Sequence, residues 1–206
     1  MAIFGAKAMH PRALEPIMKT NIHARIRNVF NPKNPGTLIS NGQTATSENA
    51  VKAVAIIKDV AMINVSGAGM VGAPGSYARI MDLLGKNHIN IMMISAAASE
   101  ANISIVIRRN QLGRALSTLE IALLDKGLVS DVTAEDDVCV IAAMGANMKG
   151  TLGVASRVFT AEARNRINIR MIAQGSSELN ISLVVKEKDG KAAVQAIHDE
   201  FKLDKI

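Results

Sequence analysis

Apolar residues along this chain alternate between two spacings. Runs rich in β-branched residues are typical of strands, and apolar residues three and four positions apart are typical of one helix face. Between residues 60 and 132 these patterns follow the order β-α-β-β-α-β, which is the ferredoxin-like arrangement. The strand-like runs are 60–65, 89–94, 102–107 and 129–132, and the helical patterns are 74–87 and 110–123.

The same pattern returns 78 positions later without a gap. Of the 48 residues in 60–107, 20 are identical to their counterparts in 138–185. A fixed period of this kind predicts one structural unit built twice. The second copy has strand-like runs at 138–143, 167–172 and 180–185, a helical pattern at 152–165 and a last helical pattern that includes Phe201.

The second copy lacks the sixth element of the arrangement, a closing strand. An unpaired sheet edge is a liability, and the strand-like run 51–57 can fill the place. We therefore predict an α+β fold of two ferredoxin-like βαββαβ domains, the first inserted in sequence into the second. The predicted divisions are an N-terminal region 1–40, a linker 41–50, the completing strand 51–57, a first domain 58–134 and a second domain 135–206.

The N-terminal region differs from the repeats in charge. Residues 1–36 contain six Lys or Arg and one Glu, so they carry +5 of the formal net charge of +6. The pattern predicts a short helix over 11–19, a strand over 24–29 and a turn over 31–36. The basic character therefore belongs to an N-terminal arm, and the repeats are nearly neutral.

Cysteine content and hydropathy predict the cellular location of the protein. The single cysteine, Cys139, lies in an apolar run, so we expect a buried hydrophobe and not a nucleophile. The lack of a disulfide framework fits a reducing cytoplasm. No run approaches the roughly 18 apolar residues of a membrane span, and the N-terminus lacks the apolar segment of a signal peptide. We expect no membrane partner.

The sequence disfavours both a nucleic-acid-binding surface and a metal site. RNA-recognition modules share the βαββαβ order, but they stack bases on aromatic residues of their central strands. The corresponding strands here carry none, and the chain has only four Phe and one Tyr. The four histidines are scattered, and none has a partner at metal-ligand spacing. We predict no nucleic-acid partner, no catalytic residues and no metal site.

A glycine loop follows the first strand of each repeat. Residues 67–72 match G-x-G-x-x-G, but the second copy replaces the middle glycine by Asn147, and no acidic residue ends the next strand, so a dinucleotide site is disfavoured. Residues 72–76 place backbone N–H groups at a helix N-terminus, which suits a carboxylate, and Glu100 could accept an ammonium group. Two interpretations stay open: an amino-acid site, or glycines that serve tight turns beside solvated glutamates.

Several segments resemble the aspartokinase family. Residues 5–12, Gly-Ala-Lys-Ala-Met-His-Pro-Arg, with Phe-Asn-Pro at 30–32, are similar to the end of its catalytic domain. The repeats resemble the paired ACT domains that follow, through Met-Ile-Ser at 93–95 with Ser-Glu at 99–100, and Met-Ile-Ala-Gln at 171–174 with Ser-Glu at 177–178. The resemblance covers essentially the whole chain.

This resemblance implies the regulatory region of an ATP-dependent aspartate kinase. Such a region binds an end-product amino acid, threonine first and lysine next, and mediates feedback inhibition of aspartate phosphorylation. It also implies a homodimer through the ACT domains and an aspartokinase catalytic domain as partner, in cis or in trans. Carried onto this chain, the effector-binding residues are Met70, Gly72, Pro74, Gly75, Ser76, Asn90, Ser99 and Glu100 in the first repeat, and Met148, Gly150, Gly153, Asn168, Gln174 and Glu178 in the second.

Two departures from the family pattern qualify this expectation. Many relatives carry Gln after Met-Ile-Ser in the first domain, whereas this chain has Ala96; only the second copy keeps it, as Gln174. The family's Lys-Phe-Gly-Gly nucleotide loop and its aspartate-binding residues are also missing. ATP and Mg would therefore belong to the missing kinase domain, and the chain is expected to be inactive alone and to need no cofactor. The alternative function is a structural dimerisation platform with silent effector sites.

Overall fold

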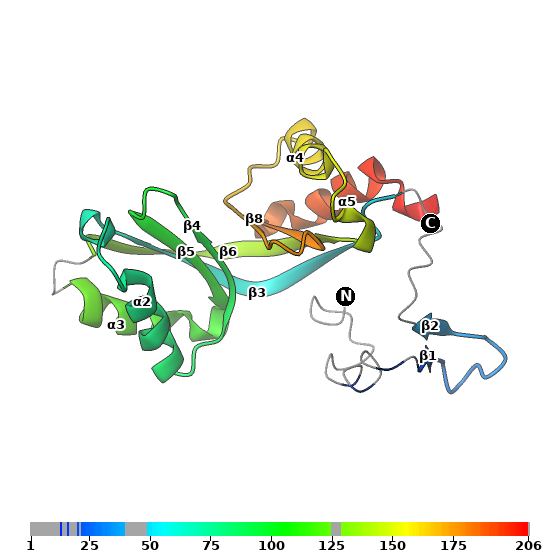
Figure 1. Ribbon diagram of the computed structural model, residues 1–206, viewed down its shortest axis with the longest axis horizontal. Coiled ribbons are helices and arrows are strands. Elements are labelled where there is room, and N and C mark those ends of the chain that lie inside the picture. Colours follow the sequence, from blue (N-terminus) through cyan, green and yellow to red (C-terminus); the bar gives the residue numbers. More distant parts are fainter. Residues whose placement is uncertain are drawn as a thin grey trace. The chain divides into compact units, whose positions relative to one another are not determined.

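The structure is a computed structural model that describes residues 13, 16, 20, 22–39, 49–124 and 129–205. The chain divides into two compact units, Met1–Glu48 and Asn49–Ile206, shown in Figure 1. In the first unit, β1 (Ala24–Ile26) pairs antiparallel with β2 (Thr37–Ile39). The predicted helix 11–19 lies almost wholly outside the described residues, as does most of the predicted linker.

The second unit contains one six-stranded sheet in the order β4-β5-β3-β6-β8-β7. Two long strands, β3 (Ala53–Ser66) and β6 (Asp131–Met144), run antiparallel through its centre. Figure 1 shows them crossing from one repeat into the other. The shorter strands are β4 (Ile91–Ala96), β5 (Asn102–Arg108), β7 (Met171–Gln174) and β8 (Asn180–Lys186).

Four α-helices and five short 3-10 helices complete the described part of this unit. The α-helices are α2 (Ser76–Lys86), α3 (Leu112–Leu123), α4 (Val154–Arg164) and α5 (Gly190–Glu200). The 3-10 helices are η3 (Ala68–Met70), η4 (Arg109–Gln111), η6 (Ala146–Met148), η7 (Glu187–Asp189) and η8 (Leu203–Lys205). The βαββαβ order and the ferredoxin-like fold class are confirmed.

One detail of the strand prediction was wrong. The predicted strands 51–57 and 60–65 are a single strand, β3, and 129–132 and 138–143 are likewise joined in β6. The polar Lys58 and Asp59 mark a β-bulge and not a strand end, with Asp59 in the left-handed region at φ 57°. The predicted divisions at residues 58 and 135 therefore fall inside continuous strands.

The two halves of β3 have different neighbours. Ala53–Ile57 pairs with Val140–Met144, which belongs to the second repeat, and Val60–Ser66 pairs with β5 of the first repeat. This pairing is the one that the insertion of the first domain into the second requires, and it supports that proposal.

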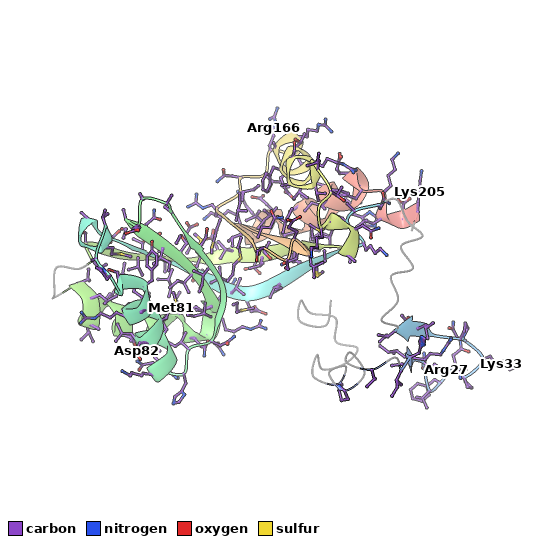
Figure 2. The ribbon with its side chains drawn as sticks, in the orientation of Figure 1. Arg27, Lys33, Met81, Asp82, Arg166 and Lys205 are labelled. Carbon is purple, nitrogen blue, oxygen red and sulfur yellow. The ribbon has the colours of Figure 1, made fainter. Side chains whose placement is uncertain are left out.

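Each repeat has its own core on the helix side of the sheet. In the first core, the strand residues Ile63 and Ile105 are clustered with Leu119 of α3. In the second, Ile141 of β6 is clustered with Val158 of α4 and with Phe201. Helix α2 shows the amphipathic pattern: Met81 packs against the first core, while Asp82 is exposed and forms an ion pair with Lys86 (Figure 2).

A third core joins the helix-free faces of the two repeats. It consists of eight buried residues that form four pairs, each pair 78 positions apart: Val60 with Val138, Met62 with Val140, Met93 with Met171, and Val106 with Val184. Val60 and Val138 are also register partners in the sheet, and Arg109 forms an ion pair with Glu187, again 78 positions away. The repeats are therefore related by an approximate two-fold axis that passes between equivalent residues.

One polar side chain interrupts the core of the second repeat. Glu162 on α4 is fully buried, and neither of its carboxylate oxygens has a hydrogen-bond partner. Burial without compensation disfavours the charged form and raises the pKa of Glu162 to about 7. The equivalent residue of the first repeat is Leu84, which is also fully buried. A carboxyl group thus occupies the place of an apolar side chain.

Candidate functional site

The glycine loops adopt the same backbone conformation in both repeats. In the first, Gly72 and Gly75 have φ of 64° and 84°, and in the second, Gly150 and Gly153 have φ of 71° and 81°. These left-handed conformations favour glycine because a side chain would clash with its own backbone. A Cβ atom at any of the four positions would meet no other atom within 4 Å. The glycines are therefore needed for the path of the loop and not for close packing.

A glutamate from the β4–β5 turn binds the first loop, and its counterpart from the β7–β8 turn binds the second. Glu100 Oε2 accepts a hydrogen bond from the Gly72 backbone N–H at 2.9 Å, and Glu178 Oε2 accepts one from the Gly150 N–H at 2.7 Å. Both glutamates have left-handed backbones, with φ of 56° and 55°. Such a conformation costs a residue other than glycine about 1–3 kcal/mol and is common at functional sites. The repeated geometry indicates a built position for each carboxylate.

A pocket of about 480 Å³ lies between the first loop and the start of α2. Its lining contains six of the eight residues predicted for this site: Met70, Gly72, Pro74, Gly75, Ser76 and Glu100. The exposed Asn90 and Ser99 are not part of the lining. Asn90 precedes β4, and Ser99, although it is next to Glu100 in the sequence, lies at the tip of the turn. The structure therefore brings most, but not all, of the predicted residues together.

Three further residues line the pocket and were not predicted: Ala73, Tyr77 and Ala78. Tyr77 and Ala78 belong to the first turn of α2, where backbone N–H groups have no acceptor within the helix. The Ser76 hydroxyl donates to the Ala73 carbonyl at 2.7 Å and keeps its lone pairs for a further donor. The signal for Tyr77 and Ala78 was present in the sequence, since they directly follow the predicted Ser76 at the helix start.

The first pocket combines two complementary charges. The N-terminus of α2 supplies unpaired N–H groups and the positive end of the helix dipole, which stabilise a carboxylate. Glu100, held against the Gly72 N–H, supplies a carboxylate to the same lining. A free amino acid carries the matching pair of groups, an α-carboxylate and an α-ammonium.

The second repeat keeps the loop but changes its surroundings. Met148 is buried beneath the loop, as Met70 is in the first repeat. However, Val154 and Ala155 stand where the first pocket has Ser76 and Tyr77. The predicted Asn168 and Gln174 are exposed, with Gln174 at the end of β7. The second site therefore shares the glycine–glutamate contact but carries its hydroxyl groups at other positions, with Thr151 and Ser156 where the first pocket has Ala73 and Ala78.

Other chemistry is not indicated by the residues that the structure describes. Among them, no group of three or more His, Cys, Asp or Glu could hold a metal ion. No helix in the described ranges is long and apolar enough to cross a membrane. Desolvation raises the pKa of the buried Cys139 thiol to about 11, which keeps it protonated and unreactive near neutral pH.

Comparison with known proteins shows which family this architecture belongs to. A family model of the ACT domain matches residues 63–123 and 141–201. The chain belongs to the ACT-domain family. The two matched segments of this ACT pair are the two repeats, and each includes its own glycine loop and glutamate turn.

The similar proteins are aspartokinases. The chloroplastic bifunctional aspartokinase/homoserine dehydrogenase of Daucus carota is 37% identical over 214 residues, which is all of this chain and 23% of that protein. The structure of Clostridium acetobutylicum aspartate kinase has a TM-score of 0.83 at 26% identity and covers 94% of this chain and 45% of that one. The regulatory subunit of Thermus thermophilus aspartate kinase has a TM-score of 0.64 at 26% identity, with 74% of this chain and 99% of that one covered.

These matches identify the ACT pair with the regulatory region of aspartate kinases. The chain spans about a quarter of the length of the curated relatives, 23% of the Daucus carota protein. The resemblance to the family that the sequence suggested is therefore confirmed.

Proposed function

We propose that the ACT pair binds an end-product amino acid and transmits feedback inhibition to an aspartokinase catalytic domain. The observation that carries this proposal is the first pocket, where the N-terminus of α2 and the Glu100 carboxylate lie in one lining. Coupling of about 1–3 kcal/mol between effector and kinase sites is sufficient for regulation. The catalytic domain, with its ATP and Mg, would be supplied in cis or in trans.

Threonine is the first candidate effector and lysine the second. The lining of the first pocket contains one carboxylate, Glu100, and the α-ammonium of any amino acid would occupy it. A lysine would bring a second ammonium group, and a desolvated charge without a partner is costly. The hydroxyl of threonine needs only a hydrogen bond. The Ser76 hydroxyl donates to the Ala73 carbonyl and can still accept such a bond from the ligand. The pocket chemistry therefore favours the smaller hydroxyl-bearing ligand.

A homodimer through the ACT domains is also proposed. Strands β4 and β7 form the two ends of the sheet order, so each has an edge without a strand partner in the described part of the unit. Ile94 on β4 and Ile172 on β7 are 43% and 41% exposed, and they are equivalent positions. Apolar edges of this kind are typical of strand pairing between chains. Its test is the mass of the chain in solution, compared with I94K and I172K variants.

The effector proposal is tested by thermal unfolding with threonine, lysine, methionine and isoleucine at millimolar concentrations. A ligand at about a hundred times its dissociation constant adds about 2.7 kcal/mol, which raises the midpoint by about 5–10 °C in a chain of this size. The regulatory subunit from Thermus thermophilus is matched over almost its whole length, which supports the use of the chain by itself.

Matched variants locate the response. E100Q keeps a hydrogen-bond acceptor for the Gly72 N–H but removes the negative charge that an ammonium group needs. We expect E100Q to abolish most of the threonine-induced rise in the unfolding midpoint. E178Q removes the corresponding charge in the second loop. A shift that survives in both variants would contradict the assigned site. If no amino acid stabilises the wild-type chain, the alternative of a structural dimerisation platform with silent effector sites is favoured.

A further inference from the structure

Strand β4 of the first repeat approaches strand β7 of the second, and we call the line along which they approach the seam. Because the repeats are related by an approximate two-fold axis, the two ends of the seam can be compared. At one end, Met92 and Ala173 pack against the third core. The equivalent positions at the other end are Arg170 and Ser95, both polar. The two ends of the seam therefore differ where symmetry would make them alike.

The polar end of the seam forms a pocket of about 330 Å³. Its walls come from both repeats: the end of β4 and the start of β5 on one side, and the chain that enters β7 on the other. The lining residues are Ser95, Ala96, Ala97, Asn102, Ser104, Ile169, Arg170, Met171 and Ile172. The volume is at the lower end of the range for small-ligand sites. No residue of the first pocket, at the glycine loop, takes part in this lining.

The first-repeat wall carries a row of hydrogen-bonding groups. Ser104 is the register partner of both Ser95 and Asn64, so the three side chains share one face of the sheet. The Ser104 hydroxyl donates to Asn64 Oδ1 at 3.2 Å. In the second repeat, Asn64 and Ser95 are both replaced by alanine, at 142 and 173. Within the described part of the chain, the Ser95 and Asn102 side chains have no hydrogen-bond partner.

The opposite wall carries a positive charge that is fixed in place. The Arg170 guanidinium forms an ion pair with Glu135 through one terminal nitrogen. Glu135 in turn lies 3.6 Å from the ammonium group of Lys186, which is also paired with Asp137. A guanidinium has five N–H donors, so the contact with Glu135 leaves donors for a ligand. This network orients Arg170 without using all its hydrogen-bonding capacity.

We propose that this seam pocket binds a small organic carboxylate, at a site separate from the glycine loops. Arg170 would bind the carboxylate, and Ser95, Asn102 and Ser104 would bind the polar groups of the same ligand. Asymmetry is the main support, because the polar replacements at 95 and 170 both line the pocket at one end of the seam, and the third, Asn64, accepts the hydrogen bond that holds the lining residue Ser104. Since the ligand would contact both repeats, its binding would stabilise their packing along the seam.

The test uses methionine methyl groups as local reporters in NMR spectra of the full 206-residue chain. Met171 lines the seam pocket, and Met70 lines the pocket at the glycine loop. The probes are succinate, citrate and acetate at millimolar concentrations, with sulfate as an inorganic anion. The variants are R170L, which removes the guanidinium and adds no methionine, and R164L as a matched arginine control on the exposed side of α4.

We expect at least one organic carboxylate to shift the Met171 signal in a saturable way and to leave Met70 unchanged. The shift should persist in R164L and fall at least tenfold in apparent affinity in R170L. The proposal is overturned if no organic probe shifts Met171, if sulfate gives the same saturable shift, or if R170L responds as the wild type does. Because Met70 reports threonine separately, failure of the seam pocket and failure of the proposed effector site give different results.

Discussion

Glu162 makes the stability of the second repeat depend on pH in a direction opposite to that of most acidic residues. A carboxyl group with an ordinary pKa near 4.5 is held at about 7 by burial in the folded chain. Between these two values the folded state binds a proton that the unfolded state has lost. The contribution of Glu162 to the free energy of unfolding is therefore fully present below about pH 4.5, declines as the pH rises and is lost above pH 7.

The magnitude follows from the difference between the two pKa values. Each pKa unit corresponds to about 1.4 kcal/mol, so the loss across this window is about 3 kcal/mol. E162L should remove the dependence, because leucine occupies the equivalent buried position at residue 84. At pH 8 we expect E162L to be more stable than the wild type by about 3 kcal/mol or slightly more, since the change also buries additional apolar surface.

The assay is urea unfolding followed by far-UV circular dichroism at several pH values between 4.5 and 8.5. Other groups titrate in the same range, so the informative quantity is the difference in unfolding free energy between wild type and variant. That difference should grow with pH up to about 7 and then stay level. E120Q changes an exposed glutamate on α3 and should give a difference near zero throughout. A wild-type curve parallel to that of E162L would refute the reasoning.

Further predictions concern three glycines and the ion pair between the repeats, and each is checked by urea unfolding. G75A should destabilise the first repeat by about 1 kcal/mol because φ is 84° there, whereas G85A, within α2, should be neutral or stabilising. G190A should cost about 1–3 kcal/mol, since its Cβ would lie 2.6 Å from the buried thiol sulfur. A double-mutant cycle on the partly exposed pair Arg109–Glu187 should give nearly additive effects; strong non-additivity would show that the pair is effectively desolvated.

The sequence predicted the order of the elements because the 78-residue repeat presents each spacing twice. It could not show that β3 and β6 are continuous. A polar pair such as Lys58 and Asp59 occurs both at strand ends and at β-bulges. Only the register of the neighbouring strands distinguishes the two cases. The helix boundaries were close, since apolar spacing and the flanking glycines both indicate them.

The candidate site was predicted in part for a similar reason. Glu100 and the glycine loop were singled out because both recur in the second copy, and their hydrogen bond explains that recurrence. Asn90 also recurs, but repetition marks shared structure as readily as a shared site, and the side chain is exposed outside the pocket. For the seam pocket, the sequence shows the polar replacements at 95 and 170 but not that they meet, because this depends on the approach of β4 to β7, which are about 80 residues apart.

The ion pair between Arg109 and Glu187 has a consequence for the history of the fold. In a true dimer of identical subunits, a residue beside the two-fold axis meets its own copy. An arginine there would face an arginine, and the like charges would repel. Joining the two copies in one chain removes this restriction, because each copy can change alone. Opposite charges at equivalent positions are therefore a contact that a dimer of identical chains cannot form, and the tandem arrangement allows the two halves to be complementary instead of identical.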